Sequence, residues 1–261
     1  APAVFAQTDT ALQAAIAAPY RTAEFTARDA ARKPYEVLEF FGVRPGATIV
    51  EISPGRSGYW TEILAPYLRE RGVYYAAQYP PDAKDGRPYW AEYHREFRAK
   101  LDASPALYGK VQMSRFGKGY YDIAPPGSAD LVLTFRNTHN WMADGYAEAA
   151  FAAFHRALKP GGILGVEGHR GRTDRPQDPQ AADGYIREDY AIALAKKAGF
   201  ELVAAGEMLA NPRDTKDYPD GVWTLPPTLR LGDRDRAKYV AIGESDKFLL
   251  KFRKPVQKPA Q

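Results

Sequence analysis

The chain has 261 residues, of which 45% are hydrophobic, and a net charge of +4 with a pI of about 9.0. This length and apolar content predict one large globular unit with a full core. Basic and acidic residues are interspersed, so nothing indicates nucleic-acid binding. No apolar stretch is long enough to predict a membrane span, and the lack of cysteine excludes cysteine nucleophiles and thiolate metal sites.

The first residues have features of a processed N-terminus. Val4-Phe5-Ala6 before Gln7 has the small-x-small character of a signal-peptidase site. We therefore expect a periplasmic or secreted protein whose charged and apolar signal regions precede Ala1. The alternative is a disordered, Ala-rich terminus of a cytoplasmic protein, and the lack of cysteine fits both.

The first half of the chain predicts alternating helices and strands. Helices are expected over 9–19 and 34–41, a strand over 47–53, and then an amphipathic helix that begins near Trp60 and ends by Gly72. A second strand is expected over 73–77. A helix over about 88–101 and a short strand near 111–115 follow.

The second half continues the alternation. Asp130 to Phe135 is an almost unbroken apolar run, typical of a strand buried on both faces of a parallel sheet. After it we expect a helix over 145–158, a strand over 163–166, a helix over 186–198 and strands over 201–205 and 247–253. This order predicts an α/β fold with a mostly parallel sheet.

Five segments carry a resemblance to a known family: VEISPGRSGY at 50–59, ADLVLTFR at 129–136, ALKPGGI at 157–163, KAGFELV at 197–203 and KFLLKFR at 247–253. In these segments the chain resembles the class I S-adenosylmethionine-dependent methyltransferases. More narrowly, FFGVRPGATIVEISPG at 40–55, TEILAPYL at 61–68 and GVWTLPP at 221–227 resemble a bacterial group of predicted methyltransferases that often carry signal peptides.

The resemblance implies a Rossmann-like, seven-stranded, mostly parallel sheet with helices on both faces and an N-terminal helical cap. Residues 1–8 would be a signal-peptide remnant or disordered, and residues 9–42 would form the cap. Residues 43–254 would form the methyltransferase-like domain, with a long excursion or lid at 208–246, before a disordered tail at 255–261.

The resemblance also implies a cofactor crevice at the carboxyl ends of the first two strands, where S-adenosylmethionine would bind. The residues expected around the cofactor are Glu51, Ser53, Gly55, Ser57, Gly58, Gln78 and Arg136. Two departures weaken the match. Ser53 and Ser57 stand where glycines are expected, and Gln78 stands where an acid would bind the ribose hydroxyls, so the charge-assisted bond is lost.

The loop after the 130–135 strand is dense in hydrogen-bonding groups. His139 is a candidate general base, Asn137 and Asn140 are candidates to orient a nucleophile, and Trp141 is a candidate platform for a substrate ring. The alternative is that the Asn and His side chains cap the next helix while Trp141 packs into the core.

The strand at 163–166 ends in Glu167 and His169, which join the candidate catalytic residues. If this strand neighbours the 130–135 strand, His139, Glu167 and His169 can share one pocket, because adjacent strands lie about 4.8 Å apart. They would form an acid/base set or, as the weaker alternative, a divalent-metal set. The chain shows no local metal motif, so we predict no metal site.

Substrate contacts are expected from Arg170, Tyr185, Arg187 and Trp223, in addition to Trp141. Arg187 could clamp an anion, although a helix start explains residues 183–188 equally well. The Pro- and aromatic-rich residues 217–227 favour a substrate lid held down by Trp223.

Three functions remain open. The leading hypothesis is a methyltransferase acting on a small molecule, with S-adenosylmethionine as cofactor. The second is an exported enzyme that uses the same crevice for acid/base or metal chemistry without S-adenosylmethionine. The third is a non-catalytic binding protein on the same scaffold.

Overall fold

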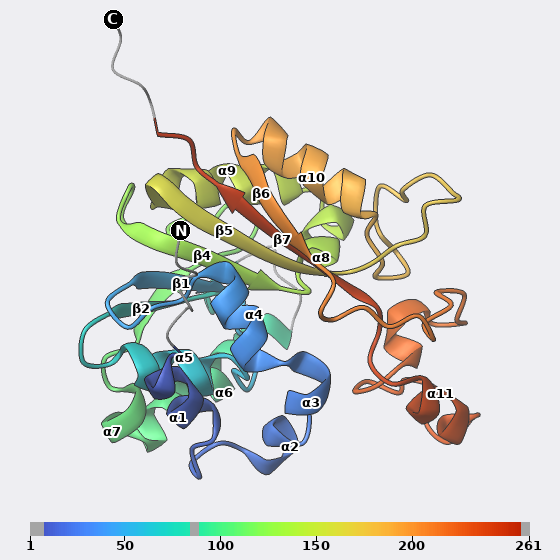
Figure 1. The fold of residues 1–261 in the computed structure, drawn as a ribbon, viewed down its shortest axis with the longest axis horizontal. Coiled ribbons are helices and arrows are strands. Elements are labelled where there is room, and N and C mark those ends of the chain that lie inside the picture. The colour runs from blue at the N-terminus through green and yellow to red at the C-terminus, as the bar shows by residue number, and fades with distance from the viewer. Residues whose placement is uncertain (1–7, 84–88, 257–261) are drawn as a thin grey trace, which may run out of the picture.

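The computed structural model describes residues 8–83 and 89–256. Its centre is a seven-stranded sheet in the order β3-β2-β1-β4-β5-β7-β6 (Figure 1). The strands are β1 Thr48–Ile52, β2 Val73–Gln78, β3 Gln112–Arg115, β4 Ala129–Phe135, β5 Leu158–His169, β6 Glu201–Gly206 and β7 Lys247–Arg253. All paired neighbours are parallel except that β7 runs antiparallel to both β5 and β6. The predicted mostly parallel, seven-stranded fold is confirmed.

Helices cover both faces of this sheet (Figure 1). They are α1 Thr10–Ile16, α2 Ala23–Thr26, α3 Asp29–Arg32, α4 Pro34–Phe41, α5 Thr61–Leu68, α6 Tyr89–Ala103, α7 Pro105–Tyr108, α8 Thr138–Ala143, α9 Ala147–Ala157, α10 Glu188–Lys197 and α11 Arg236–Ile242, with a 3₁₀ turn η1 at Gly221–Thr224. Successive β4 residues enter different apolar layers: Leu131 and Leu133 join the layer under α4 and α5, whereas Val132 joins the layer under α9 and α10. Both faces of β4 are therefore buried, which explains its apolar run.

Three stretches differ from the expected elements. The N-terminal cap contains two short helices, α2 and α3, that have no clear apolar periodicity. The Lys159–Gly162 turn lies inside a longer β5, because Gly161 and Gly162 bond to Lys254 beyond β7. The 208–246 excursion contains η1 and α11 and projects beyond the ends of the strands (Figure 1).

The predicted processing site at residues 4–7 lies outside the described residues, so export stays a prediction. Among the residues that are described, no helix has both the length and the apolar character needed to cross a bilayer.

The N-terminal cap is fastened to the sheet domain through Glu62 of α5. Its side chain is 1% exposed and accepts hydrogen bonds from the Thr22 backbone N–H at 2.9 Å and the Thr22 hydroxyl at 2.5 Å. Lys100 of α6 pairs with the same carboxylate at 2.5 Å. One buried carboxylate therefore joins the cap, α5 and α6.

We expect Glu62→Ala to lower the free energy of unfolding by about 1–3 kcal/mol, because it leaves three partly buried donors without their acceptor. The control is Glu70→Ala, which removes a carboxylate that is 78% exposed and lies 3.6 Å from Arg69, and should change stability by less than about 1 kcal/mol. Denaturant unfolding of both variants measures the difference. Equal losses would mean that Glu62 does not fasten the cap.

Candidate active site

A cavity of about 310 Å³ lies where β1, β4 and β5 end. Parallel strands leave their loops and free backbone groups at this edge, so ligands bind here in open α/β sheets. The cap, the first loop, the β4 loop and the 208–246 excursion all contribute to its wall. Its lining residues are Arg32, Glu51, Ile52, Ser53, Pro54, Gly55, Tyr59, Trp60, Phe135, Arg136, Asn137, His139, Asn140, His169, Val222, Trp223, Pro226, Pro227, Thr228, Glu244 and Ser245.

Of the first-loop residues that were predicted around the cofactor, Glu51, Ser53 and Gly55 line this cavity. Ser53 adopts φ +52°, a left-handed conformation that favours glycine, and its N–H donates to the Ala77 carbonyl at 2.8 Å. Gly55 has φ +79°, and a Cβ built there would meet no atom within 4 Å. Ser53 can thus hold the glycine-type turn, and Gly55 leaves the space beside it open.

Ser57 and Gly58, which were predicted around the cofactor, have other roles. Ser57 is exposed, and its carbonyl accepts a hydrogen bond from Lys100 at 2.6 Å. Gly58 is buried, and a Cβ there would lie 2.7 Å from the Thr61 hydroxyl and 2.8 Å from the Phe97 ring. Packing against α5 and α6 therefore requires the glycine at 58.

Gln78 is placed differently from the ribose partner that we expected. Its side chain is 2% exposed, and its amide donates a 2.7 Å hydrogen bond to the Gly55 carbonyl. Gln78, at the end of β2, thus stabilises the first loop through this bond. The prediction that Gln78 contacts the ribose is therefore wrong.

The β4 loop brings a second set of predicted residues to the cavity. Arg136 has φ +61° and its N–H donates to the Glu167 carbonyl at 2.8 Å. Asn137, at the N-cap position of α8, donates from its amide to the Ile52 carbonyl at 2.9 Å, which joins the β4 and β1 loops. His139 and Asn140 line the cavity one turn further on.

Trp141 is placed away from this cavity, in the core. Its side chain is 2% exposed and packs against Phe116 and Phe154, with ring centroids at 5.1 and 5.4 Å. Position 141 lies on the α8 face that meets α9, so its bulk fills the apolar layer. The prediction that Trp141 is a platform for a substrate ring is therefore wrong.

The two predicted histidines lie close together. The His139 and His169 ring centroids are 5.6 Å apart, and both residues line the cavity. His169 Nδ1 is 2.6 Å from the Ser245 hydroxyl. Burial, followed by the nearby His139 and Arg136, holds the pKa of His169 well below its usual value, so His169 is neutral at physiological pH.

Glu167 does not complete a metal set with these histidines. Its carboxylate lies 3.3 Å from Arg136 Nε, and its side chain is buried. Within residues 8–83 and 89–256, no three His, Asp or Glu side chains gather so as to hold a metal ion. The donors proposed for the metal alternative are therefore not arranged as ligands in this structure.

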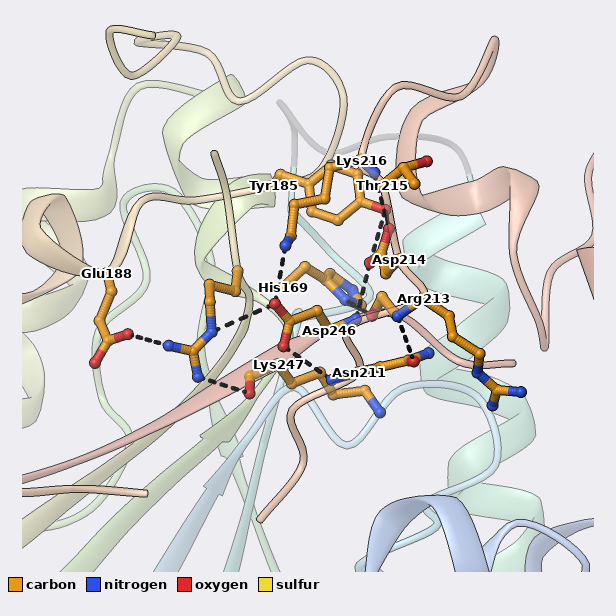
Figure 2. Close-up of polar contacts among 12 residues, drawn as sticks. His169, Tyr185, Glu188, Asn211, Arg213, Asp214, Thr215, Lys216, Asp246 and Lys247 are labelled. Atoms are coloured by element: carbon orange, nitrogen blue, oxygen red, sulfur yellow. Dashed lines mark hydrogen bonds and ion pairs between the residues drawn. The ribbon is translucent and has the colours of Figure 1, made fainter. Parts of the chain in front are cut away.

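Three predicted substrate residues do not line the cavity and make polar contacts elsewhere. Arg170 pairs with Glu188 and Glu207 at 2.6 Å each and with Asp246 at 3.5 Å. Tyr185 donates to the Asp214 carboxylate at 3.0 and 3.1 Å (Figure 2).

The third of these residues, Arg187, is engaged on the surface. It pairs with Asp189 at 2.5 Å and donates to the Arg175 carbonyl at 2.8 Å. Because their polar groups are engaged in this way, Arg170, Tyr185 and Arg187 support the excursion and its neighbouring loop. The prediction that they contact a substrate in this cavity is therefore wrong.

Part of the 208–246 excursion, which was predicted to be a lid, lines the cavity, and Trp223 is one of its lining residues. The Trp223 ring lies 5.8 Å from the His139 ring, edge to face. The Asp214 carboxylate accepts the Asp246 N–H at 2.8 Å and so fastens the start of the lid to its end (Figure 2).

Several lining residues were missed, among them Arg32, Tyr59, Trp60, Glu244 and Ser245. Trp60 fits the apolar stripe of α5, and it stacks on Phe135 at 4.2 Å, but its buried Nε1 has no hydrogen-bond partner among the described residues. Arg32 and Glu244 meet only through the tertiary fold. The apolar pattern could have indicated Trp60, but no local signal marks the other four.

The strand order, the single antiparallel β7 and the cavity above β1 and β4 define the class I methyltransferase fold. The chain is similar to a S-adenosylmethionine-dependent methyltransferase from Aquifex aeolicus, with a TM-score of 0.57, 15% identity and coverage of 87% of this chain and 93% of that one.

Two further structures are similar over comparable lengths. CrArsM, an arsenic(III) S-adenosylmethionine methyltransferase from Chlamydomonas reinhardtii, has a TM-score of 0.52 and 16% identity, over 96% of this chain and 75% of that one. The [4+2]-cyclase SpnF has a TM-score of 0.54 and 18% identity, over 87% and 82%. No family model and no curated protein sequence matches the chain. These comparisons establish the fold.

Glu51 is a buried acid at the end of β1, 2% exposed. The Tyr74 hydroxyl donates to its carboxylate, and the Thr61 hydroxyl donates at 3.3 Å. Burial raises the pKa of Glu51 from 4.5 to about 7, although the two hydroxyls and the Arg32 charge oppose this rise.

Glu51 should therefore make stability depend on pH. Because its pKa is higher in the folded protein, the unfolded carboxyl ionises first, and the free energy of unfolding falls between pH 4.5 and about 7. The fall is on the order of 3 kcal/mol. Glu51→Gln, which does not titrate, should remove this component in denaturant titrations across that range. An identical pH slope in both proteins would contradict the raised pKa.

The position of Gln78 gives a second expectation. Gln78→Glu would set a carboxylate against the Gly55 carbonyl, so the 2.7 Å bond would be replaced by two acceptors facing one another. We expect a loss of about 1–3 kcal/mol in the free energy of unfolding and no gain in affinity for S-adenosylhomocysteine by calorimetry. A tighter complex would mean that position 78 does face the ribose.

Proposed function

We propose that the protein is a S-adenosylmethionine-dependent methyltransferase that acts on a small molecule. The observation that carries this proposal is the cavity above β1 and β4, in a class I methyltransferase fold, with a glycine-type turn at Ser53–Gly55 on one side and His139 on the other. The cavity volume of about 310 Å³ is of the size of small-molecule sites, which favours a small acceptor over a macromolecule.

The residues of the first loop fit a cofactor at this end of the cavity. The open space beside Gly55 would admit it, and the unpartnered Trp60 Nε1 can donate a hydrogen bond to it. When bound, S-adenosylmethionine supplies an electrophilic methyl group.

The chain's own residues would prepare the acceptor. His139 would take the proton from an acceptor oxygen or nitrogen, and Asn140 would orient that group. Neutral His169, held by Ser245, would keep its ring beside His139 without adding a positive charge.

A second candidate is an enzyme that uses this cavity without S-adenosylmethionine. It is favoured by Gln78, whose amide is engaged by the first loop where a ribose-binding acid would otherwise stand. The similarity to a structure described as a [4+2]-cyclase is compatible with this candidate. Calorimetry with S-adenosylhomocysteine separates the two, because only the methyltransferase should bind it.

Gly55→Val is expected to abolish that binding, because the branched side chain would fill the open space beside the loop, while its backbone strain at φ +79° should be no greater than that of the control. Gly119→Val is the matched control: Gly119 has the same φ of +79° and the same open surroundings but lies in an exposed turn away from the cavity. Equal S-adenosylhomocysteine affinity in wild type and Gly55→Val would place the cofactor elsewhere. Lack of binding by the wild type would favour the second candidate.

A further inference from the structure

One wall of the cavity gathers more positive than negative charge. Arg28, Arg32, Arg136 and Lys247, here called the cationic wall, surround two carboxylates. Glu244 pairs with Arg28 at 2.7 Å, with Lys247 at 3.0 Å and with Arg32 at 3.8 Å. Glu167 pairs with Arg136 at 3.3 Å. Four cations against two carboxylates leave an excess of two positive charges.

The nearby acid Glu51 does not cancel this excess. With a pKa of about 7, it carries about half of a negative charge at neutral pH, so at least one positive charge remains uncompensated. Neutral His169 adds none. Burial and the charges of Arg136 and Arg28 lower the pKa of Arg32 to about 9, which shows that its positive charge is in an unfavourable environment.

The two members of the cationic wall that line the cavity are incompletely bonded. Arg32 is 4% exposed and Arg136 is partly buried, and both line the cavity. Among the described residues, the buried Nε atoms of both side chains have no hydrogen-bond partner of good geometry. Guanidinium groups bind carboxylates through paired N–H donors, so two of them beside one cavity suit a planar anion.

We propose that the acceptor substrate is a small carboxylic acid whose carboxylate binds between Arg32 and Arg136. This proposal rests on the proposed methyltransferase function and adds the chemical class of the acceptor. Arg136 follows β4 directly and, like His139, lies close enough to His169 to lower its pKa. Arg32 reaches the same group of charges from α3, where its guanidinium also lies 4.2 Å from the centre of the Tyr59 ring. The carboxylate would therefore anchor the molecule whose nucleophile faces His139. Trp60, Phe135 and Trp223 offer ring surfaces for an aromatic acid.

The test compares benzoate with its neutral analogue benzamide, by ligand-observed NMR titration of the full chain without cofactor. Wild type should bind benzoate at least tenfold more tightly. Arg32→Met and Arg136→Met should each lose that preference. Arg44→Met is the control, because it removes an arginine that is 61% exposed, pairs with Asp130 at 3.2 Å and does not line the cavity in the described structure, and it should keep the preference. Arg32→Lys, which retains the charge without the planar fork, should keep part of it and guards against misfolding of the methionine variant.

Two results would overturn the proposal: equal binding of benzoate and benzamide by wild type, or a preference that survives in both cavity variants. A second arm identifies the source of the anion by comparing S-adenosylhomocysteine with 5′-methylthioadenosine, which lacks the amino-acid carboxylate. Suppose that Arg32→Met and Arg136→Met lower the affinity for S-adenosylhomocysteine but not for 5′-methylthioadenosine, and that S-adenosylhomocysteine displaces benzoate. The arginines then bind the cofactor carboxylate, and the acceptor proposal fails.

Simultaneous binding of benzoate and S-adenosylhomocysteine would support the proposal. A benzoate preference in a protein that binds no S-adenosylhomocysteine would keep the anion site and refute the methyltransferase function. The two proposals therefore fail in distinguishable ways.

Discussion

The carboxylate of Glu244 is the contact on which the cavity depends. It lies between Arg28 and Arg32 of the N-terminal cap and Lys247 at the start of β7, and these cations lower its pKa to about 2. Burial alone would raise the pKa of a carboxyl group, so the surrounding charges dominate. This carboxylate joins segments more than 200 residues apart in the wall of the site. It also allows Arg32 to remain charged where little water reaches it.

Much of the fold could be predicted from the sequence because its strands have distinctive surroundings. The run at β4 is apolar because both faces are covered, and the turns at Gly72 and Gly199 end their helices where expected. The short cap helices α2 and α3 could not be predicted in this way. They are held by tertiary bonds, such as the 2.5 Å hydrogen bond that the Tyr59 hydroxyl donates to Asp29, rather than by an amphipathic pattern.

The site was predictable mainly where a residue follows directly from the end of a strand; Trp223, predicted from the aromatic and Pro-rich excursion, is an exception. Ser53, Gly55, Arg136, Asn137, His139 and His169 line the cavity for that reason. Predictions failed where the direction of a side chain decides the role: Gln78 turns to the Gly55 carbonyl, and Trp141 turns into the core. Residue type and position in the chain do not determine that direction, because it depends on the packing of neighbouring elements.

Gly58 has a consequence for interpreting this loop in other chains. Its hydrogen atom faces the Phe97 ring and the Thr61 hydroxyl, so any larger residue would push α6 away from α5. A descendant that had lost every ligand would still need glycine here to fold. Retention of the glycine at 58 is thus a record of helix packing, whereas at position 55 no packing contact requires glycine, and only the backbone φ of +79° and a bound ligand favour it. A side chain at 55 would therefore be stronger evidence of an abandoned cofactor loop than identity at 58 is of a working one.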